Sequence, residues 1–248
     1  MRLVAANYPS ILNMPFLSSL RCAAFVFAFP VLLTGGSASA TEPPPCVEDF
    51  ADVDRLPAQG WSIANLSDPV GVTTWEQGLA SVFSSYEGAP DAYAAADLAA
   101  TQGSPATISL WLITPMIDFG PNSISARALD LYARALPGAA NRLVVRQCLT
   151  SASEDCNAPA SGIGGFTTAL IEINRDLLVD GFPLTWTHFI ATPADGLATV
   201  GVGRIAFHYS IPSQPDGSHG TYIGPDSVMM TGATTCPFGE NVFENGFD

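Results

Sequence analysis

Acidic side chains crowd the start of the expected folded region, where carboxylates could bind a metal ion. Glu48, Asp49, Asp52 and Asp54 lie close together in the sequence. Carboxylate and carbonyl oxygens are the ligands that Ca²⁺ prefers, although a run of acids is also typical of a solvated edge. If the two ends of the domain meet, Asp226 is the distant ligand. We therefore expect a structural Ca²⁺ site formed by Glu48, Asp49 and Asp226.

The cysteines are placed so that they can join those two ends. The chain after residue 40 contains Cys46, Cys148, Cys156 and Cys236, and an even number of cysteines in an exported domain indicates disulfides. Of the three pairings, we favour Cys148–Cys156, which closes a short loop, together with Cys46–Cys236, which ties the ends of the domain. A zinc site is disfavoured because the sequence contains no C-x-x-C motif.

Tryptophans supply the largest aromatic faces of the sequence, at positions 61, 75, 111 and 186. A tryptophan in a β-sandwich is usually packed inside with its N–H bonded, so a core position is expected for most of them. An exposed tryptophan would instead be a platform for the face of a sugar. Trp75 is the candidate ligand-binding residue, because it follows the loop-like stretch Asp68-Pro69-Val70-Gly71.

The histidines, His188, His208 and His219, do not fall in a known catalytic motif. Neither G-x-S-x-G nor H-E-x-x-H occurs in the sequence. A Ser-His-Asp set assembled in space, or a carboxylate pair suited to glycoside hydrolysis, stays open. We expect no catalytic residue and no enzyme activity, and a secreted hydrolase of polysaccharide or protein is the alternative.

The basic residues, nine in all, are all arginine, and the formal net charge is −14. The absence of lysine excludes a P-loop lysine, a Schiff-base lysine and a kinase strand lysine. The acidity disfavours a nucleic-acid partner, because affinity for phosphate comes from Lys and Arg. Hydrophobic residues make up 48% of the chain and charged ones 13%, a balance that indicates a folded domain rather than a disordered one.

The first forty residues have the layout of a signal peptide. They contain two Arg and no acid, and an apolar run at 23–33 follows Arg21. Ala38-Ser39-Ala40 then supplies a small-residue cleavage site. We predict a signal peptide at 1–40 with translation beginning at Met14; a buried N-terminal helix is the alternative. The apolar run is shorter than the ~18 residues that a membrane-spanning helix needs, so no transmembrane segment is expected.

Short segments of alternating polarity follow Cys46, separated by turns rich in Gly and Pro. In residues 126–135, Leu129 and Leu131 alternate with Asp130 and Tyr132, as in a strand with one buried face. The predicted strands are 107–113, 126–135, 142–149, 166–173, 184–191, 204–209 and 222–230, and residues 92–100 are expected to form a helical turn or two. This pattern predicts an all-β fold, an antiparallel jelly-roll β-sandwich, as a single domain at 41–237 with a C-terminal tail at 238–248.

Four stretches, in this order, resemble the choice-of-anchor J domain, which is also called the cleaved adhesin domain. They are Glu48-Asp49-Phe50 with Gly60-Trp61, then Thr74-Trp75, then SLWLITPMIDF at 109–119, and finally 204–209 with 222–228. The resemblance implies a jelly-roll β-sandwich, related to the MAM domain, that serves adhesion or ligand binding on secreted and surface bacterial proteins. The sequence departs from the family at Pro225-Asp226-Ser227, where two adjacent acids usually precede the valine.

These observations predict a secreted or cell-surface module that binds an extracellular glycan or protein and has no catalytic activity of its own. A hydrolase and a purely structural surface component are the alternatives. Exposed aromatic residues in loops would favour binding, whereas histidines and carboxylates that converge in a deep cleft would favour an enzyme.

The exported protein should begin at or near Thr41, because Ala38-Ser39-Ala40 ends the signal-like segment. Intact-mass measurement and N-terminal sequencing of the exported protein test this. A mature species that retains residues 14–40 would contradict the prediction.

Overall fold

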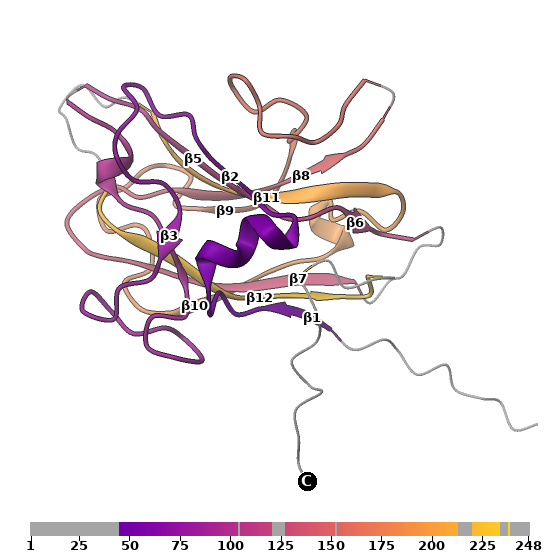
Figure 1. Cartoon of the computed structure of the whole chain (residues 1–248), viewed down its shortest axis with the longest axis horizontal. Coiled ribbons are helices and arrows are strands. Elements are labelled where there is room, and N and C mark those ends of the chain that lie inside the picture. The colour runs from indigo at the N-terminus through magenta and orange to yellow at the C-terminus, as the bar shows by residue number, and fades with distance from the viewer. Residues whose placement is uncertain are drawn as a thin grey trace, which may run out of the picture. The chain divides into compact units, whose positions relative to one another are not determined.

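Strands with one apolar face pack into two sheets, sheet A and sheet B, which lie face to face as two layers (Figure 1). The computed structural model describes residues 45–103, 105–120, 127–151, 153–212, 220–233 and 238. The predicted signal peptide and the predicted tail beyond Phe238 lie outside the described residues. The described residues belong to one compact unit, and no helix among them has the length and apolar character needed to cross a membrane.

Sheet A is composed, in spatial order, of β1 (Cys46–Glu48), β12 (Ile223–Thr231), β7 (Ala128–Ala135) and β10 (Thr187–Ala191). Sheet B is composed of β2 (Ser62–Asn65), β5 (Ile108–Ile113), β11 (Val202–Ile211), β8 (Leu143–Leu149) and β9 (Thr168–Ile173), and β6 (Ile117–Asp118) pairs with β11. The short strands β3 (Glu76–Gln77) and β4 (Ala94–Ala95) pair with each other, and the 3-10 helices are η1 (Val53–Gln59), η2 (Leu98–Ala100) and η3 (Pro193–Asp195).

The chain crosses repeatedly between the two sheets. After β7 in sheet A come β8 and β9 in sheet B, then β10 in sheet A, β11 in sheet B and β12 in sheet A. The pairing is antiparallel throughout the described strands. The predicted antiparallel sandwich is therefore confirmed. Each predicted strand is present, with its ends shifted by three residues or fewer.

Period-two alternation fills the space between the sheets. On β7, Leu129 and Leu131 are fully buried in the core, whereas Tyr132, which follows Leu131, lies on the opposite face. On β11, Ile205 and Phe207 contribute the facing apolar layer. Each such side chain stabilises the fold by roughly 1.5–3 kcal/mol through burial. Because the inner face of β7 forms part of the core, its polar residues Asp130 and Tyr132 lie on the outer face.

An aromatic cluster around Trp61 connects the N-terminal part of the domain with its C-terminal end. The Trp61 ring lies 5.9 Å from the Phe50 ring and 5.6 Å from the Phe238 ring, centroid to centroid. Phe238 is 4% exposed. The packed domain thus includes residue 238, the first residue of the segment predicted to be a tail.

Residues 92–100 are mostly extended and contain only one helical turn, η2. Ala94, Ala96 and Ala100 are buried in the main core, and Ala96 exchanges backbone hydrogen bonds with Ile223 of β12. Small side chains let this segment lie flat against β12. Tertiary burial therefore outweighs the helical propensity of alanine, which is weak over so few residues.

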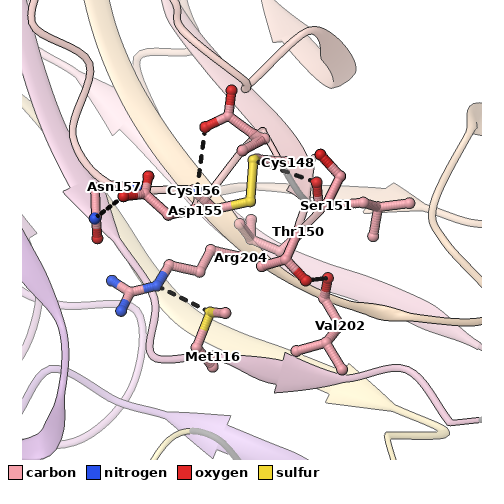
Figure 2. The surroundings of a disulfide bond; sticks show 12 residues. Met116, Cys148, Thr150, Ser151, Asp155, Cys156, Asn157, Val202 and Arg204 are labelled. Atoms are coloured by element: carbon pink, nitrogen blue, oxygen red, sulfur yellow. Dashed lines mark hydrogen bonds between the residues drawn. A yellow bond between two sulfur atoms is a disulfide. The ribbon is translucent and has the colours of Figure 1, made fainter.

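The predicted disulfide Cys148–Cys156 is confirmed, with Cα atoms 5.6 Å apart. Figure 2 shows that it ties the end of β8 to the loop that follows. Both cysteines pack with Trp111 and Phe166 in a small cluster on the outer side of sheet B. Cys236 lies outside the described residues, so the pairing of Cys46 with Cys236 stays a prediction.

Replacing Cys148 and Cys156 together with alanine should lower the free energy of unfolding by about 2–3 kcal/mol, because the bridge restricts the unfolded chain. Denaturant unfolding of the oxidised protein measures this change. Non-reducing peptide mapping is the control, and it also tests Cys46–Cys236. A peptide linking Cys46 to Cys148, or an unchanged free energy of unfolding, would contradict the assignment.

Candidate functional site

The predicted calcium ligands lie apart in the structure. Glu48 lies on the core side of sheet A, because it alternates with the exposed Val47. Asp226 pairs with Tyr132, whose side chain lies on the outer face of the same sheet. Among the described residues, no three His, Cys, Asp or Glu side chains gather closely enough to hold a metal ion. The structure does not bring the three residues together, and calcium binding by them stays a prediction.

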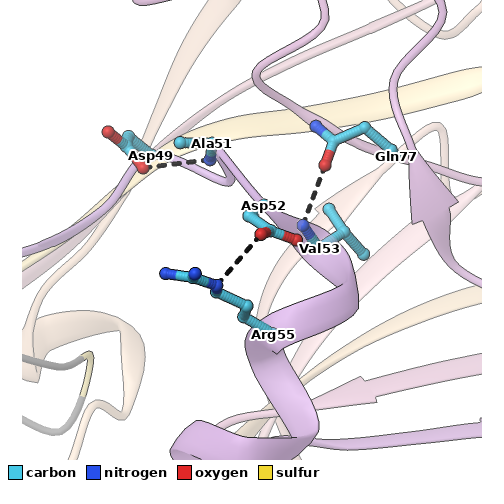
Figure 3. Close-up of polar contacts among 6 residues, drawn as sticks. All are labelled: Asp49, Ala51, Asp52, Val53, Arg55 and Gln77. Carbon is cyan, nitrogen blue, oxygen red and sulfur yellow. Dashed lines mark hydrogen bonds and ion pairs between the residues drawn. The ribbon is translucent and has the colours of Figure 1, made fainter.

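The remaining acids of the N-terminal run are engaged locally, as Figure 3 shows. The Asp49 carboxylate accepts a hydrogen bond from the Ala51 N–H at 3.0 Å, and Asp52 pairs with Arg55 at 3.2 Å on the surface. The segment is held in place by the amide of Gln77, whose Oε1 accepts a hydrogen bond from the Val53 N–H at 2.8 Å. The Gln77 amide thus anchors the backbone of this part of the run, and the Asp52–Arg55 pair lies at the surface.

Trp75 is 2% exposed and belongs to the main core, so the structure corrects the expectation of an exposed platform at this position. It lines a hollow of about 580 Å³ together with Thr74, Glu76 and Asp54, but its ring face is covered. Burying an indole removes a large apolar area from water. This gain explains why the residue turns inward although the preceding stretch is a loop.

Asp226 is a fully buried carboxylate at a bulge in β12. The register with β7 shifts between Asp226 and Met229, and Ser227 has a left-handed backbone with a φ of 49°. The Asp226 Oδ2 atom accepts hydrogen bonds from the N–H groups of Tyr86 at 2.7 Å and Glu87 at 3.4 Å. This carboxylate thus fastens the β3–β4 loop, residues 78–93, to the outer face of sheet A.

Aromatic packing also holds the β3–β4 loop. The Phe83 ring lies 5.6 Å from Trp186 and 4.9 Å from Tyr93, and the Arg134 guanidinium lies 4.3 Å from the centre of the Phe83 ring. The Trp186 indole donates a hydrogen bond to the Ser84 carbonyl at 2.9 Å. The loop is therefore fixed on both sides of Tyr86.

Tyr86 is the only exposed Phe, Tyr or Trp among the described residues, at 45% exposure. Its ring stacks on Tyr132, with ring centres 3.5 Å apart and planes inclined by 12°. The inner face of the Tyr86 ring is thus covered by Tyr132, and the side chain stays open to solvent. A hydrogen bond with the Tyr86 side chain, followed by burial, raises the pKa of Tyr132, so the Tyr132 phenol is neutral at physiological pH.

Polar groups flank this aromatic pair. The His188 Nε2 atom lies 2.7 Å from the Asp130 Oδ1 atom, and the imidazole centre lies 5.0 Å from the Tyr132 ring. His188 occupies the position opposite Tyr132 on β10. We call Tyr86, Tyr132, Asp130 and His188 the Tyr86 surface. It offers an exposed aromatic ring beside hydrogen-bonding groups, an arrangement suited to a flat ligand that carries hydroxyl groups.

A serine and a histidine also meet on sheet B, but out of reach of a substrate. The Ser109 Oγ atom lies 3.1 Å from the His208 Nε2 atom and accepts a hydrogen bond from the Trp111 indole at 3.1 Å. His208 is 4% exposed, and burial lowers its pKa to about 3. The buried Ser109–His208 pair is therefore part of the packing on the outer side of sheet B. His219 lies outside the described residues.

Sequence reasoning did not single out the Tyr86 surface. Tyr132 and Asp130 were expected on one face of a strand, and His188 was expected in another strand, but nothing in the sequence showed that β7 and β10 are neighbours. The available signal for Tyr86 was its place in Ser84-Ser85-Tyr86-Glu87-Gly88, an aromatic residue in a turn-rich segment.

The fold is similar to that of known adhesin domains. The K1 cleaved adhesin domain of Lys-gingipain from Porphyromonas gingivalis W83 matches with a TM-score of 0.51 at 20% identity, covering 76% of this chain and 98% of that one. The K3 cleaved adhesin domain of the same protein matches with a TM-score of 0.47 at 17% identity, covering 77% and 99%. The chain therefore has the fold of a cleaved adhesin domain, which the sequence resemblance implied.

A carbohydrate-binding module of the β-sandwich superfamily matches more weakly, with a TM-score of 0.38 at 11% identity, covering 69% of this chain and 57% of that one. No protein-family model matches the chain. No curated protein matches it either. These similarities establish the fold of the chain and do not identify its ligand.

The domain should be more stable at pH 5 than at pH 8. Burial raises the pKa of Glu48 from 4.5 to about 7 and that of Asp226 from 3.8 to about 6, so the folded chain binds these protons more tightly than the unfolded chain does. The stabilisation is complete below the unfolded pKa values and is lost as the pH rises through 6 and 7. Glu48 alone should contribute about 2 kcal/mol to this change.

Thermal unfolding at several pH values, in the presence of a chelator, measures the effect. The Glu48→Gln variant should show a smaller dependence on pH, whereas the matched control Asp54→Asn, at an exposed position, should behave like the unmodified protein. A melting temperature that rises from pH 5 to pH 8 would contradict the assignment.

Proposed function

We propose that this protein is an extracellular, non-catalytic module that binds a glycan at the Tyr86 surface. The observation that carries the proposal is Tyr86, the one exposed Phe, Tyr or Trp ring in the described part of the chain, which stacks on Tyr132 and is fixed by a buried carboxylate. Exposure of a large aromatic side chain removes it from the core, where it would stabilise the fold. The Tyr86 ring is held in one position at the surface by Tyr132 and by the Asp226 carboxylate, so it is available to a ligand, as binding residues on loops fixed by a rigid scaffold commonly are.

Sugar rings have apolar C–H faces that stack on aromatic rings and hydroxyl groups that exchange hydrogen bonds at their edge. Tyr86 would supply the stacking face, Asp130 would accept hydrogen bonds, and His188 would donate or accept according to its protonation state. An aromatic contact of this kind contributes on the order of 1 kcal/mol beyond area burial. One platform gives weak binding, which suits a module that engages a repetitive polymer at many points.

Two further observations support a binding role outside the cell. The fold is that of a cleaved adhesin domain, a likeness that bears on function only by analogy. The Cys148–Cys156 disulfide is typical of an oxidising compartment, and it agrees with the signal peptide that the sequence predicts. A secreted or cell-surface location follows from these features as part of the proposal.

The hydrolase alternative has less support. Ser109 and His208 are packed within sheet B, and the His188–Asp130 pair lies on an open strand face with His188 46% exposed. The hollow at Trp75 contains no histidine, and neither does a hollow of about 600 Å³ beside Leu98 and Tyr222. An enzyme is expected to have a deep cleft in which histidines and carboxylates converge. Neither of these two hollows and neither of these two histidine pairs has that combination.

Tyr86→Ala should reduce the affinity for a bound polysaccharide by about tenfold, since it removes the stacking face, while Tyr86→Phe should retain most of the affinity. A panel of immobilised neutral polysaccharides (cellulose, xylan and starch) identifies the polymer, and calorimetry with soluble fragments gives the dissociation constants. Val72→Ala, at another exposed loop position with 83% exposure, is the matched control and should change nothing.

Failure of the unmodified protein to bind any of the polysaccharides would contradict the proposal. Equal affinities for the unmodified protein and Tyr86→Ala would place the ligand elsewhere.

A further inference from the structure

Three arginines gather on the outer face of sheet B. Arg146 lies on β8 and Arg142 directly precedes this strand. Leu143 and Val145 point into the core, so the two arginines share the opposite face. Arg175 follows the end of β9. We call these residues, together with Glu172, the arginine cluster.

The single carboxylate of this cluster is shared among three guanidinium groups. Glu172 lies opposite Val144 in the β8–β9 ladder, and Val144 stands between Arg142 and Arg146 in the sequence. It pairs with Arg175 and is the opposing charge that acts on both Arg142 and Arg146. The cluster thus carries more positive than negative charge, although the formal net charge of the chain is −14.

The other described arginines are engaged in separate structural contacts. Arg127 is buried and donates to the carbonyls of Ala198 and Gly232. Arg134 lies over the Phe83 ring, as described above. Arg55 pairs with Asp52, and Arg204 contacts the Met116 sulfur. The arginine cluster is therefore the one place in the described part of the chain where several guanidinium groups lie around one carboxylate.

Fixed geometry prepares these guanidinium groups for a ligand. Arg142 donates from Nε to the Ser210 carbonyl at 2.8 Å and from Nη2 to the Ser210 hydroxyl at 3.0 Å, which leaves Nη1 without a part in these bonds. The buried Arg146 Nε has no hydrogen-bond partner. Burial lowers the pKa of His208, and the charges of Arg146 and Arg142 lower it further, so this histidine stays neutral.

We propose that the arginine cluster is a second binding surface, and that it takes an acidic polysaccharide through its carboxylate or sulfate groups. The planar fork of an arginine matches such groups and stays charged at any physiological pH. Arg142 and Arg146 are four positions apart along an extended chain, so their backbones are about 13 Å apart. A row of charges with this spacing suits a polymer with repeated anionic groups better than one small anion.

The surroundings favour a polysaccharide over a protein partner. Protein interfaces have an apolar centre. The apolar residues on this face of sheet B are covered instead, with Val144 1% exposed and Trp111 fully buried. The arginine cluster and the Tyr86 surface lie on opposite outer faces of the sandwich. The second surface is therefore independent of the proposed function at Tyr86, and the domain would hold two different polymers at once.

Binding of the exported protein to polygalacturonate, chondroitin sulfate and neutral dextran tests the proposal. In 0.1 M salt the distant acids are largely screened, because the Debye length is about 10 Å. The protein should bind at least one acidic polymer and not dextran, and Arg175→Gln combined with Arg146→Gln should lower the affinity by about tenfold or more. Arg55→Gln, which removes an exposed arginine outside the cluster, is the matched control and should leave the affinity unchanged.

Because Arg146 is half-buried, Arg175→Gln alone is the second variant, and it should weaken binding without lowering the melting temperature. Tyr86→Ala should keep full affinity for the acidic polymer, so that failure here and failure at the Tyr86 surface are distinguishable. Three outcomes would overturn the proposal: no binding to either acidic polymer, binding of Tyr86→Ala to dextran as tight as its binding to the acidic polymer, or equal loss in Arg55→Gln.

Discussion

The buried carboxylate of Asp226 is the interaction on which the proposed binding surface depends. It joins sheet A to the β3–β4 loop by accepting hydrogen bonds from the N–H groups of Tyr86 and Glu87. Burial opposes the ionised form and raises the pKa to about 6, while the backbone hydrogen bonds lower it only in part. At neutral pH this carboxylate therefore costs stability. We interpret the cost as the consequence of holding a loop backbone, and with it the Tyr86 ring, in one position.

The sandwich architecture restricts where binding can take place. Because the facing sides of sheets A and B form one core, ligands have access only to the outer faces and the loops. The outer face of sheet A carries neutral aromatic and hydrogen-bonding groups, whereas the outer face of sheet B carries the disulfide cluster and the arginine cluster. Two chemically different surfaces on one small domain suit a protein that connects separate polymers.

The sequence was sufficient to predict the strands because their alternation is regular. The alternation of Leu129 and Leu131 with Asp130 and Tyr132 identified β7 and its two faces. The short interval between Cys148 and Cys156 identified their disulfide. Trp75 was misplaced because neighbouring Gly and Pro indicate a loop but carry no information on the direction of the ring. Its burial is decided by tertiary packing around η1 and β2.

Asp226 and Glu48 face opposite sides of sheet A for a local reason that the sequence does not display. Without a bulge, Asp226 and Val228 would lie on the same face of β12, and Asp226 would then face the same side as Glu48. The extra residue, Ser227, reverses the alternation, so that Val228 enters the core while Asp226 turns to the outer face. The same bulge places Asp226 where it accepts a hydrogen bond from the Tyr86 N–H, so one irregularity separates two of the predicted calcium ligands and anchors the proposed binding surface.

Amide hydrogen exchange in the Asp226→Asn variant, compared with the unmodified protein at pH 7.5, tests most directly whether this carboxylate holds the binding surface. The account predicts faster exchange at the amides of Tyr86 and Glu87, unchanged protection in β7 and β11, and weaker polysaccharide binding. Unchanged protection of these two amides together with unchanged binding would contradict it.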